Sequence, residues 1–295
     1  MTYLVGVTLL WAFSYSLIGV YLSGQVDSYF AVLTRISLAA LLFFPVLRPR
    51  SLPVRLVFAL MAVGALQIGL MYAFFYQSFL WLSVPEVLLF TIFTPVYITL
   101  IEDLLAGRFN PFYMSTALGA VAGAAVIRYH GVSTDYWTGF AIVQGANLCF
   151  AAGQVAYRRV APRLPTDVPS WTVFGWFFIG AWPLAALLFL VLGDHAALPR
   201  TGVQWSVLLW LGLGASGLGY FAWNRGAARV DAGALAVMNN ALIPAGLLVN
   251  LLIWNHDADL PRLAAGAAII GASLGVNAVW ARRRTQRIDA AWSNH

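Results

Sequence analysis

The sequence predicts an all-α integral membrane protein with ten transmembrane helices, arranged as two inverted five-helix repeats. Three observations lead to this prediction: an apolar composition, ten long apolar runs, and a proline at the centre of two matching runs. Of the 295 residues, 61% are hydrophobic and 9% are charged, and the mean hydropathy is +0.79, so polar surface is too scarce to cover a soluble globule. Long, continuously apolar runs indicate membrane-spanning helices rather than the alternating segments of a barrel.

Ten runs have about the length of 20 residues that crosses a bilayer core. They lie near residues 3–22, 29–47, 56–80, 84–105, 111–127, 137–157, 169–192, 204–223, 232–254 and 262–281. The connections between them are short and rich in Gly, Pro, Asp and Arg, which leaves no room for a separate soluble domain. Because neither a basic segment nor a small-residue cleavage site accompanies the first run, we expect a retained span rather than a signal peptide.

The distribution of arginine predicts the orientation. Arginine supplies all 17 basic residues, and most of them fall on one side when successive connections are assigned to alternate faces. Positive residues gather at cytoplasmic ends, so we expect a multi-pass protein of the bacterial inner membrane with both termini in the cytoplasm. Cys149 is the only cysteine, so the sequence allows no intrachain disulfide and no cysteine-based metal cluster.

The ten spans divide into a first repeat, residues 1–130, and a second repeat, residues 131–295, which ends in a short basic cytoplasmic tail. Because five is an odd number, the second half enters the membrane from the opposite side, and the halves form an inverted repeat. Aligning Pro95 with Pro244 places LFTIFTPVYITLIEDLL over VMNNALIPAGLLVNLLI without a gap. Proline-interrupted spans at corresponding positions of two halves are typical of a transporter's binding site.

The two prolines predict where the substrate passes. Proline lacks an N–H and displaces the carbonyl four residues earlier, so Pro95 frees the carbonyl of Thr91 and Pro244 frees that of Asn240. At membrane depth a freed carbonyl needs a neighbouring helix, a side chain or a water-filled cavity. The residues expected to line an aqueous path are Thr91, Thr94, Asn239 and Asn240. The alternative is a pair of kinks closed by local hydroxyl and amide groups, with the asparagines joining helices.

The other polar groups within the spans are mostly amides and hydroxyls, and aromatic residues accompany them. Such a lining suits an amphipathic or zwitterionic organic solute rather than an inorganic ion. The predicted substrate-binding residues are Trp11, Ser14, Tyr15, Tyr72, Tyr76, Phe90, Thr91, Thr94, Asn147, Trp223, Asn239 and Asn240. Pro95 and Pro244 are the predicted hinges. For any single aromatic residue, the alternative is a position at the membrane interface or against lipid.

Arg35 is the one basic residue well inside a predicted span. A charge there is costly, so Arg35 is predicted to serve function or to pair with a buried carboxylate; the alternative is a shallow position from which it reaches the interface. Glu86 and Glu102 are the acidic residues nearest to membrane depth. Arg35, Glu86 and Glu102 are therefore the candidates for charge coupling.

Three segments carry a resemblance to known proteins: LLWAFSYSLIG in the first span, the arginine within AVLTRISLAALLFF in the second, and TPV at the centre of the fourth. In these segments the chain resembles the drug/metabolite transporter superfamily. Within the superfamily the chain is similar to the EamA-type carriers, which include the YddG-type exporters of aromatic and other amino acids. One departure is Gly107-Arg108, where the family commonly has Gly-Glu after the fourth-span proline. Acidic residues come earlier here, at Glu102 and Asp103, and Asp257 lies near the matching distance in the second half.

The sequence favours secondary transport over catalysis. It contains no phosphate-binding loop, no HExxH and no nucleophile elbow, and no connection is long enough for an ATP-handling domain. The main prediction is export of amino acids, aromatic ones included, or of similar amphipathic metabolites. One alternative is an importer of a small metabolite or vitamin, and a second, of another class, is a membrane-embedded lipid-modifying enzyme. The expected partners are a small-molecule substrate and the lipid bilayer, with no nucleic acid, cofactor or metal, and we expect a monomer.

Overall fold

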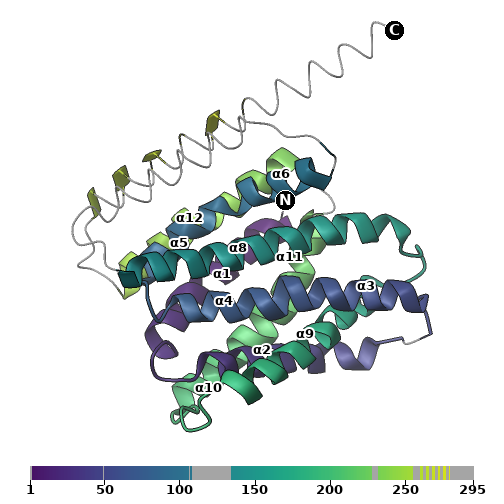
Figure 1. Ribbon diagram of the computed structural model, residues 1–295, viewed down its shortest axis with the longest axis horizontal. Helices are drawn as coiled ribbons and strands as arrows, with labels where there is room; N and C mark the ends of the chain where they lie inside the picture. Colours follow the sequence, from purple (N-terminus) through teal and green to yellow (C-terminus); the bar gives the residue numbers. More distant parts are fainter. Residues whose placement is uncertain are drawn as a thin grey trace, which may run out of the picture.

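The structure, a computed structural model, describes residues 2–48, 50–105, 107, 134–227 and 232–254, together with scattered residues between 260 and 279. Within these residues every regular element is a helix, as the composition predicts. The helices run roughly side by side along one direction of the molecule (Figure 1).

Seven helices in the described part are long and apolar enough to cross a membrane. They are Thr2–Tyr21, Ser28–Val46, Val54–Ser78, Val84–Leu105, Asp135–Arg163, Ser170–Leu192 and Gly202–Gly226. They match the predicted spans one to four and six to eight, and a further helix of 22 residues matches the ninth. The predicted fifth span lies outside the described residues, and the tenth is represented only by scattered ones. Ten helices and an inverted repeat therefore stay predictions.

Several spans consist of more than one element. The helices are α1 Thr2–Tyr21, α2 Ser28–Phe43, α3 Val54–Gly64, α4 Met71–Ser78, α5 Val84–Phe90, α6 Thr94–Leu105, α8 Thr134–Val160, α9 Ser170–Leu192, α10 Gly202–Leu209, α11 Gly219–Ala227 and α12 Ala232–Ile253. The short 3-10 segments are η1 Phe44–Val46, η3 Thr91–Phe93 and η4 Ala161–Arg163, and the π-helical segments are η2 Ala65–Leu70 and η5 Trp210–Leu218.

The fourth span is interrupted where the proline predicts. Between α5 and α6 the chain forms the 3-10 segment η3, and Pro95 is the second residue of α6. The third and eighth spans are interrupted differently, because each contains a π-helical segment between two α-helices. Such segments occur often at functional sites of helical proteins.

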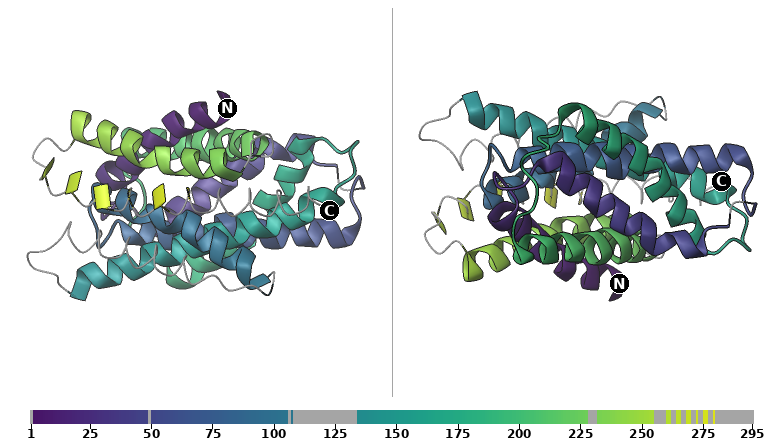
Figure 2. Two further views of the ribbon diagram at one scale, coloured as in Figure 1. Left: turned by 90° about the horizontal axis from the view of Figure 1, so that it is seen from above. Right: turned by 90° about the horizontal axis from the view of Figure 1, so that it is seen from below.

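The helix contacts follow a reciprocal pattern. The first span packs on the eighth and ninth, and the sixth packs on the third and fourth. The second span packs on the seventh and eighth, and the seventh packs on the second and third. Figure 2 shows two of these pairs, α1 with α12 and α8 with α6. Exchanging spans one to four for spans six to nine reproduces these contacts, as an inverted repeat would require.

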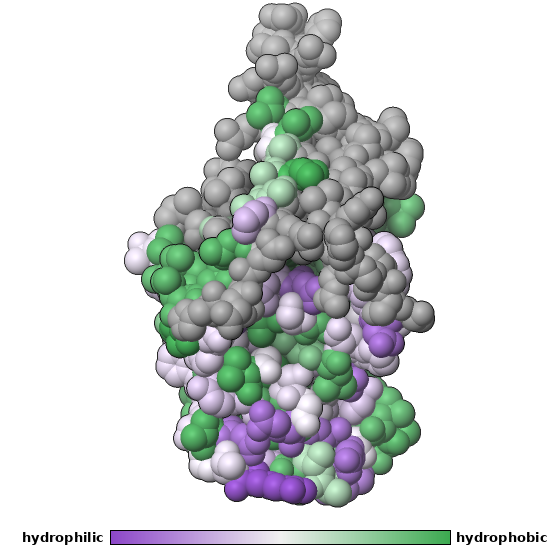
Figure 3. Space-filling model, turned by 90° about the vertical axis from the view of Figure 1, so that its left-hand side faces the viewer, coloured by the Kyte–Doolittle hydropathy of each residue, from purple (hydrophilic) through white to green (hydrophobic). Residues whose placement is uncertain are grey.

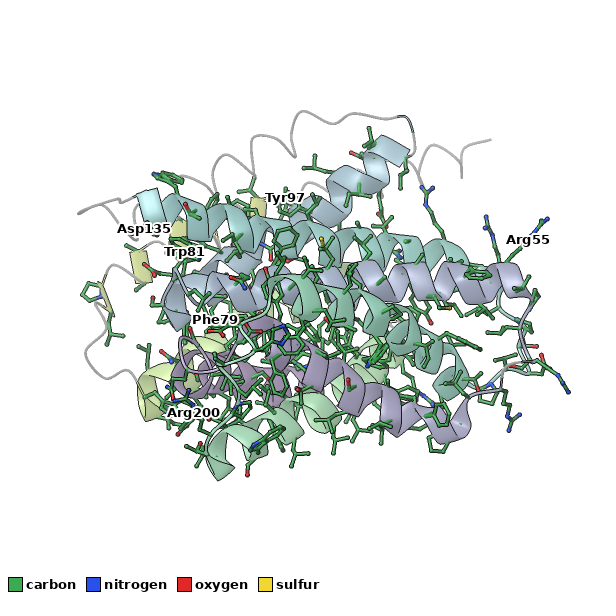
Figure 4. The ribbon with its side chains drawn as sticks, turned by 60° about the horizontal axis from the view of Figure 1, so that its bottom comes forward. Arg55, Phe79, Trp81, Tyr97, Asp135 and Arg200 are labelled. Atoms are coloured by element: carbon green, nitrogen blue, oxygen red, sulfur yellow. The ribbon has the colours of Figure 1, made fainter. Side chains whose placement is uncertain are left out.

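Polar side chains gather at one end of the bundle. Viewed from that end, hydrophilic residues concentrate toward the lower edge of the described face, with hydrophobic residues above them and at the flanks (Figure 3). Figure 4 places Arg55 at one end and Trp81, Asp135 and Arg200 at the other. The arginine pattern also assigns Arg55 and Arg200 to opposite faces of the membrane. Which end faces the cytoplasm stays a prediction.

Glycines allow α3 and α9 to approach each other closely. A Cβ on Gly64 would overlap the backbone of Phe177, and a Cβ on Gly180 would overlap the backbone of Met61. In a bilayer, helices associate through such close packing because lipid is as apolar as their side chains. The contact between α3 and α9 therefore depends on two residues without side chains.

This contact can be tested with Gly64→Ala. The added methyl group must displace the backbone of α9, so we expect the protein to lose about 1–3 kcal/mol of stability. The measurement is the thermal unfolding midpoint in detergent. Gly6→Ala is the matched control, because a Cβ there meets nothing within 4 Å and alanine favours the helix. Equal midpoints for both variants and the wild type would contradict the packing described here.

Candidate functional site

A cavity lies between spans of both halves. Its walls come from α1, α2, α4, η3, α6, α8, α11 and α12, so the interrupted fourth span borders it. The centres of water molecules can occupy about 100 Å³ of it, which is room for several waters. A central cavity beside a broken span is where carriers bind their substrates.

The structure brings most of the predicted site residues together around this cavity. Those lining it are Trp11, Ser14, Tyr15, Tyr72, Thr91, Thr94, Asn147 and Trp223, along with Pro95 and Arg35. Phe90 does not line it, because its fully buried ring packs against Tyr136 and Phe140. Tyr76 is also outside the lining, and its hydroxyl accepts a hydrogen bond from Arg35. The side chains of Asn239, Asn240 and Pro244 lie outside the described residues.

Some lining residues are not among those that the sequence predicts. They are Met71, Phe75, Ala146, Phe150, Tyr220 and Leu242. For Tyr220 a signal exists, because GLMYAFF of the third span aligns with GLGYFAW of the eighth and sets Tyr72 against Tyr220. Small and purely apolar residues such as Ala146 and Leu242 carry no comparable signal.

Arg35 is 3% exposed and reaches the cavity from the middle of α2. Its Nε donates to Oγ of Ser216, and its Nη1 donates to the hydroxyl of Tyr76 at 3.3 Å. The guanidinium carbon lies 4.1 Å from the centre of the Tyr72 ring, and the Tyr72 hydroxyl is 2.9 Å from Ser216 Oγ. The cation is thus held by hydroxyl groups and an aromatic face.

Asn147 of α8 connects the sixth span to the break in the fourth. Its Nδ2 donates to the carbonyl of Phe90 at 2.7 Å, and its Oδ1 accepts from Thr94 Oγ1 at 3.2 Å. Nδ2 also donates to Gln144 at 3.1 Å. These bonds satisfy a backbone carbonyl at the end of α5 that the break deprives of its usual helical donor.

The prediction that Pro95 frees the carbonyl of Thr91 needs correction. That carbonyl accepts the backbone N–H of Thr94 in a 3-10 hydrogen bond, because the chain tightens before the proline. The carbonyl that a side chain of another helix satisfies is that of Phe90, one residue earlier. The hydroxyl of Thr91 donates to the carbonyl of Leu88 at 2.7 Å, the local closure that the alternative described.

Aromatic rings form much of the cavity wall. Trp11 lies 5.2 Å from Tyr220 and 5.1 Å from Trp223, between ring centres, and its Nε1 donates to the carbonyl of Ala215 at 2.8 Å. Nε1 of Trp223 and Nε2 of Gln144 are buried donors without a partner among the described residues. An unpaired buried donor is costly, and Trp223 lines the cavity, so its Nε1 favours an acceptor brought by a ligand.

The two acidic candidates for charge coupling lie away from the cavity. Glu86 accepts from the backbone N–H and the hydroxyl of Ser83, both at 2.8 Å, at the start of α5. Glu102 forms an ion pair with Arg158 at 2.8 Å, and both side chains are about half exposed. Arg35 is the only one of the three predicted charged residues at the cavity.

The apolar spans, the broken helix and the central cavity together define a membrane carrier. Comparison with curated proteins supports this class. Over 277 residues the chain is 55% identical to a probable biotin transporter of Pseudomonas aeruginosa, covering 94% of this chain and 97% of that protein. It is 48% identical over 291 residues to the biotin transporter of Salmonella typhimurium, covering 98% and 97%. The chain belongs to the same family of bacterial membrane transporters as these proteins.

A more distant relative is also a membrane transporter, and a solved structure shares the fold. The aromatic amino acid exporter YddG of Ancylobacter novellus is 30% identical over 219 residues, covering 72% of this chain and 73% of that protein. A crystal structure of a protein described without a function matches with a TM-score of 0.66 and 21% identity, covering 96% and 97% of the two chains, which supports the fold alone. No family model matches the chain. The narrower EamA-type assignment therefore stays a prediction.

The relatives decide between the predicted functions at a coarse level. They are transporters, so the lipid-modifying enzyme loses its support. They favour the alternative of a metabolite or vitamin carrier over the main prediction of amino acid export. The amino acid prediction has the support of the more distant exporter YddG, at 30% identity. The predicted membrane location and small-molecule substrate agree with these names.

The bond from Asn147 to Phe90 gives a test. Asn147→Leu keeps the size of the side chain but can neither donate nor accept, so the Phe90 carbonyl and the Thr94 hydroxyl lose a side-chain partner, at a cost of about 1–3 kcal/mol. We expect a lower thermal unfolding midpoint and a large loss of transport. Leu148→Ala is the control on the same helix, because its side chain is largely exposed on the outer surface. Wild-type stability and transport in Asn147→Leu would show that the break needs no such cap.

Proposed function

We propose that this chain is a secondary carrier that takes up biotin, or a vitamin of closely similar chemistry, across the bacterial inner membrane. The observation that carries the proposal is the 55% identity with a probable biotin transporter over almost the full length of both chains. Two further biotin transporters at 48% and 47% identity support it. Uptake agrees with the importer alternative that the sequence left open.

The chemistry of the cavity suits such a vitamin. Biotin joins a neutral cyclic urea to an apolar chain that ends in a carboxylate. Rings such as Trp11, Phe75 and Trp223 supply apolar walls, while the oxygens of Asn147 and Thr94 supply neutral acceptors for the urea N–H groups. The urea carbonyl would accept from a free donor such as Trp223 Nε1. A mostly apolar pocket with a few converging polar groups is the usual form of a small-molecule site.

For the mechanism we propose alternating access between two halves, residues 1–130 and 131–295. The reciprocal helix contacts, the π-helical segments in spans three and eight, and the aligned prolines Pro95 and Pro244 all support an inverted repeat. In such carriers one helical bundle rocks against another around a fixed central site. The interrupted spans would then supply the hinges, and the arginine-rich ends would face the cytoplasm with both termini.

The substrate proposal is tested by uptake. Cells that neither make nor import biotin should accumulate labelled biotin when they express this chain, because the relatives carry that name. Excess unlabelled biotin should compete, and excess phenylalanine should not. Cells with the empty vector provide the background. Accumulation that phenylalanine blocks, or export of preloaded phenylalanine without biotin uptake, would favour the amino acid prediction instead.

The hinge proposal is tested by Pro95→Ala and Pro244→Ala. Restoring a backbone N–H lets the helix close, so we expect turnover to fall more than substrate affinity. Turnover comes from transport in proteoliposomes and affinity from equilibrium binding. Pro183→Ala is the matched control, because Pro183 lies inside α9 with an exposed side chain away from the cavity. Wild-type turnover in both hinge variants would reject the proposal.

A further inference from the structure

We propose that Arg35 binds the carboxylate of the transported molecule, and that the cavity thereby selects monocarboxylate anions with an uncharged polar head. The inference rests on the proposed function, because it concerns the same cavity. It adds the chemical class of the substrate and the residue that selects it.

The first support is the burial of a charge without an opposite charge. Arg35 is 3% exposed, and its described hydrogen-bond partners are the hydroxyls of Ser216 and Tyr76. No aspartate or glutamate of the described residues lines the cavity. A cation inside a membrane span is costly unless an opposite charge compensates it. An anionic ligand that paired with Arg35 would therefore bind with a favourable charge interaction that the protein itself does not supply.

The rest of the sequence offers no hidden partner at membrane depth. Four acidic residues lie outside the described part of the chain: Asp231, Asp257, Asp259 and Asp289. All four fall in predicted connections or in the C-terminal tail rather than within a predicted span. Of the described acids in the fourth span, Glu86 accepts from Ser83 and Glu102 pairs with Arg158. These two and Asp103 lie near the ends of the span, and none of the three lines the cavity.

The guanidinium is also fixed in place. Ser216 holds Nε from the π-helical segment η5, and the ring of Tyr72 supports the flat face at 4.1 Å. The close approach of α2 to η5 depends on Gly212, where a Cβ would come within 2.7 Å of the Cβ of Leu38. The two described hydrogen bonds use two of five guanidinium donors, so three are available to a carboxylate. A fixed arginine with free donors matches the planar geometry of a carboxylate.

The remainder of the cavity explains why a zwitterion is a poorer ligand. An amino acid brings an ammonium group as well, and among the described lining residues there is no carboxylate to receive it. The polar groups on the side of α8 and the broken span are Asn147 and Thr94, both neutral. An uncharged head such as a cyclic urea or an amide can bond there without the cost of a buried second charge.

The test compares carboxylates with their primary amides. Equilibrium binding to the purified protein in detergent is measured for biotin, lipoate and pantothenate and for the carboxamide of each. We expect every acid that binds to exceed its amide by roughly 30-fold or more, since the amide leaves the buried cation unpaired. In Arg35→Gln this preference should disappear, and in Arg35→Lys it should be reduced. Arg55→Gln, an exposed arginine at one end of the bundle (Figure 4), should keep it.

The outcomes separate the inference from the proposed function. If biotin does not bind but another acid exceeds its amide, biotin is the wrong substrate and Arg35 keeps its role. Equal binding of acid and amide to the wild type overturns the inference even if biotin is transported. Binding of none of the acids overturns both. The comparison on the wild type stands even if Arg35→Gln fails to fold, and a preference that persists in a folded Arg35→Gln assigns the carboxylate to another residue.

Discussion

The structure depends on one constraint, that a polar group placed at membrane depth is costly unless it finds a partner there. The break in the fourth span exposes a backbone carbonyl at Phe90, and Asn147 reaches across from the sixth span to meet it. The cation of Arg35 is met by Ser216 and by the face of Tyr72. Both solutions join elements far apart in the sequence, and both lie at the cavity. The polar centre of the protein therefore also ties its two halves together.

The sequence could predict the spans, because crossing hydrocarbon demands long apolar helices and few other arrangements satisfy the backbone. It could also predict the break near Pro95 from the chemistry of proline alone. It could not predict which carbonyl accepts a hydrogen bond from another helix. A 3-10 turn gives the Thr91 carbonyl a backbone donor, and Asn147 donates to the carbonyl of Phe90 instead. Ser216 stands in a glycine-rich run that gives no sign of holding an arginine. Aromatic and amide side chains can bind many kinds of solute, so the lining alone does not indicate the substrate class. The proposed class depends on the similarity to named transporters.

The proposed repeat and the side chains of the cavity would have different roles in a carrier. The repeat would provide the change of conformation, and the side chains would recognise the ligand. Tyr72 and Tyr220 occupy matching positions in the aligned third and eighth spans, but Tyr76 is matched by Asn224 and Ser216 by Ile68. The two residues that hydrogen-bond to Arg35, Tyr76 and Ser216, therefore have no equivalents in the other half of the alignment. A scaffold of similar halves would provide two related states, while unlike side chains would give the ligand a single orientation.

The π-helical segments η2 and η5 impose a requirement on helical winding as well as on residue type. A π-helix carries more residues in each turn than an α-helix, so it shifts the angular position of everything that follows. If the six residues of η2 wound as an ordinary α-helix, Tyr72 would turn by about 100° around the helix axis and its ring would leave its place beneath Arg35. Substitutions in these spans change one contact at a time. A change from π to α winding there would reorient a whole wall of the cavity, so the winding of the span decides which side chains a ligand meets.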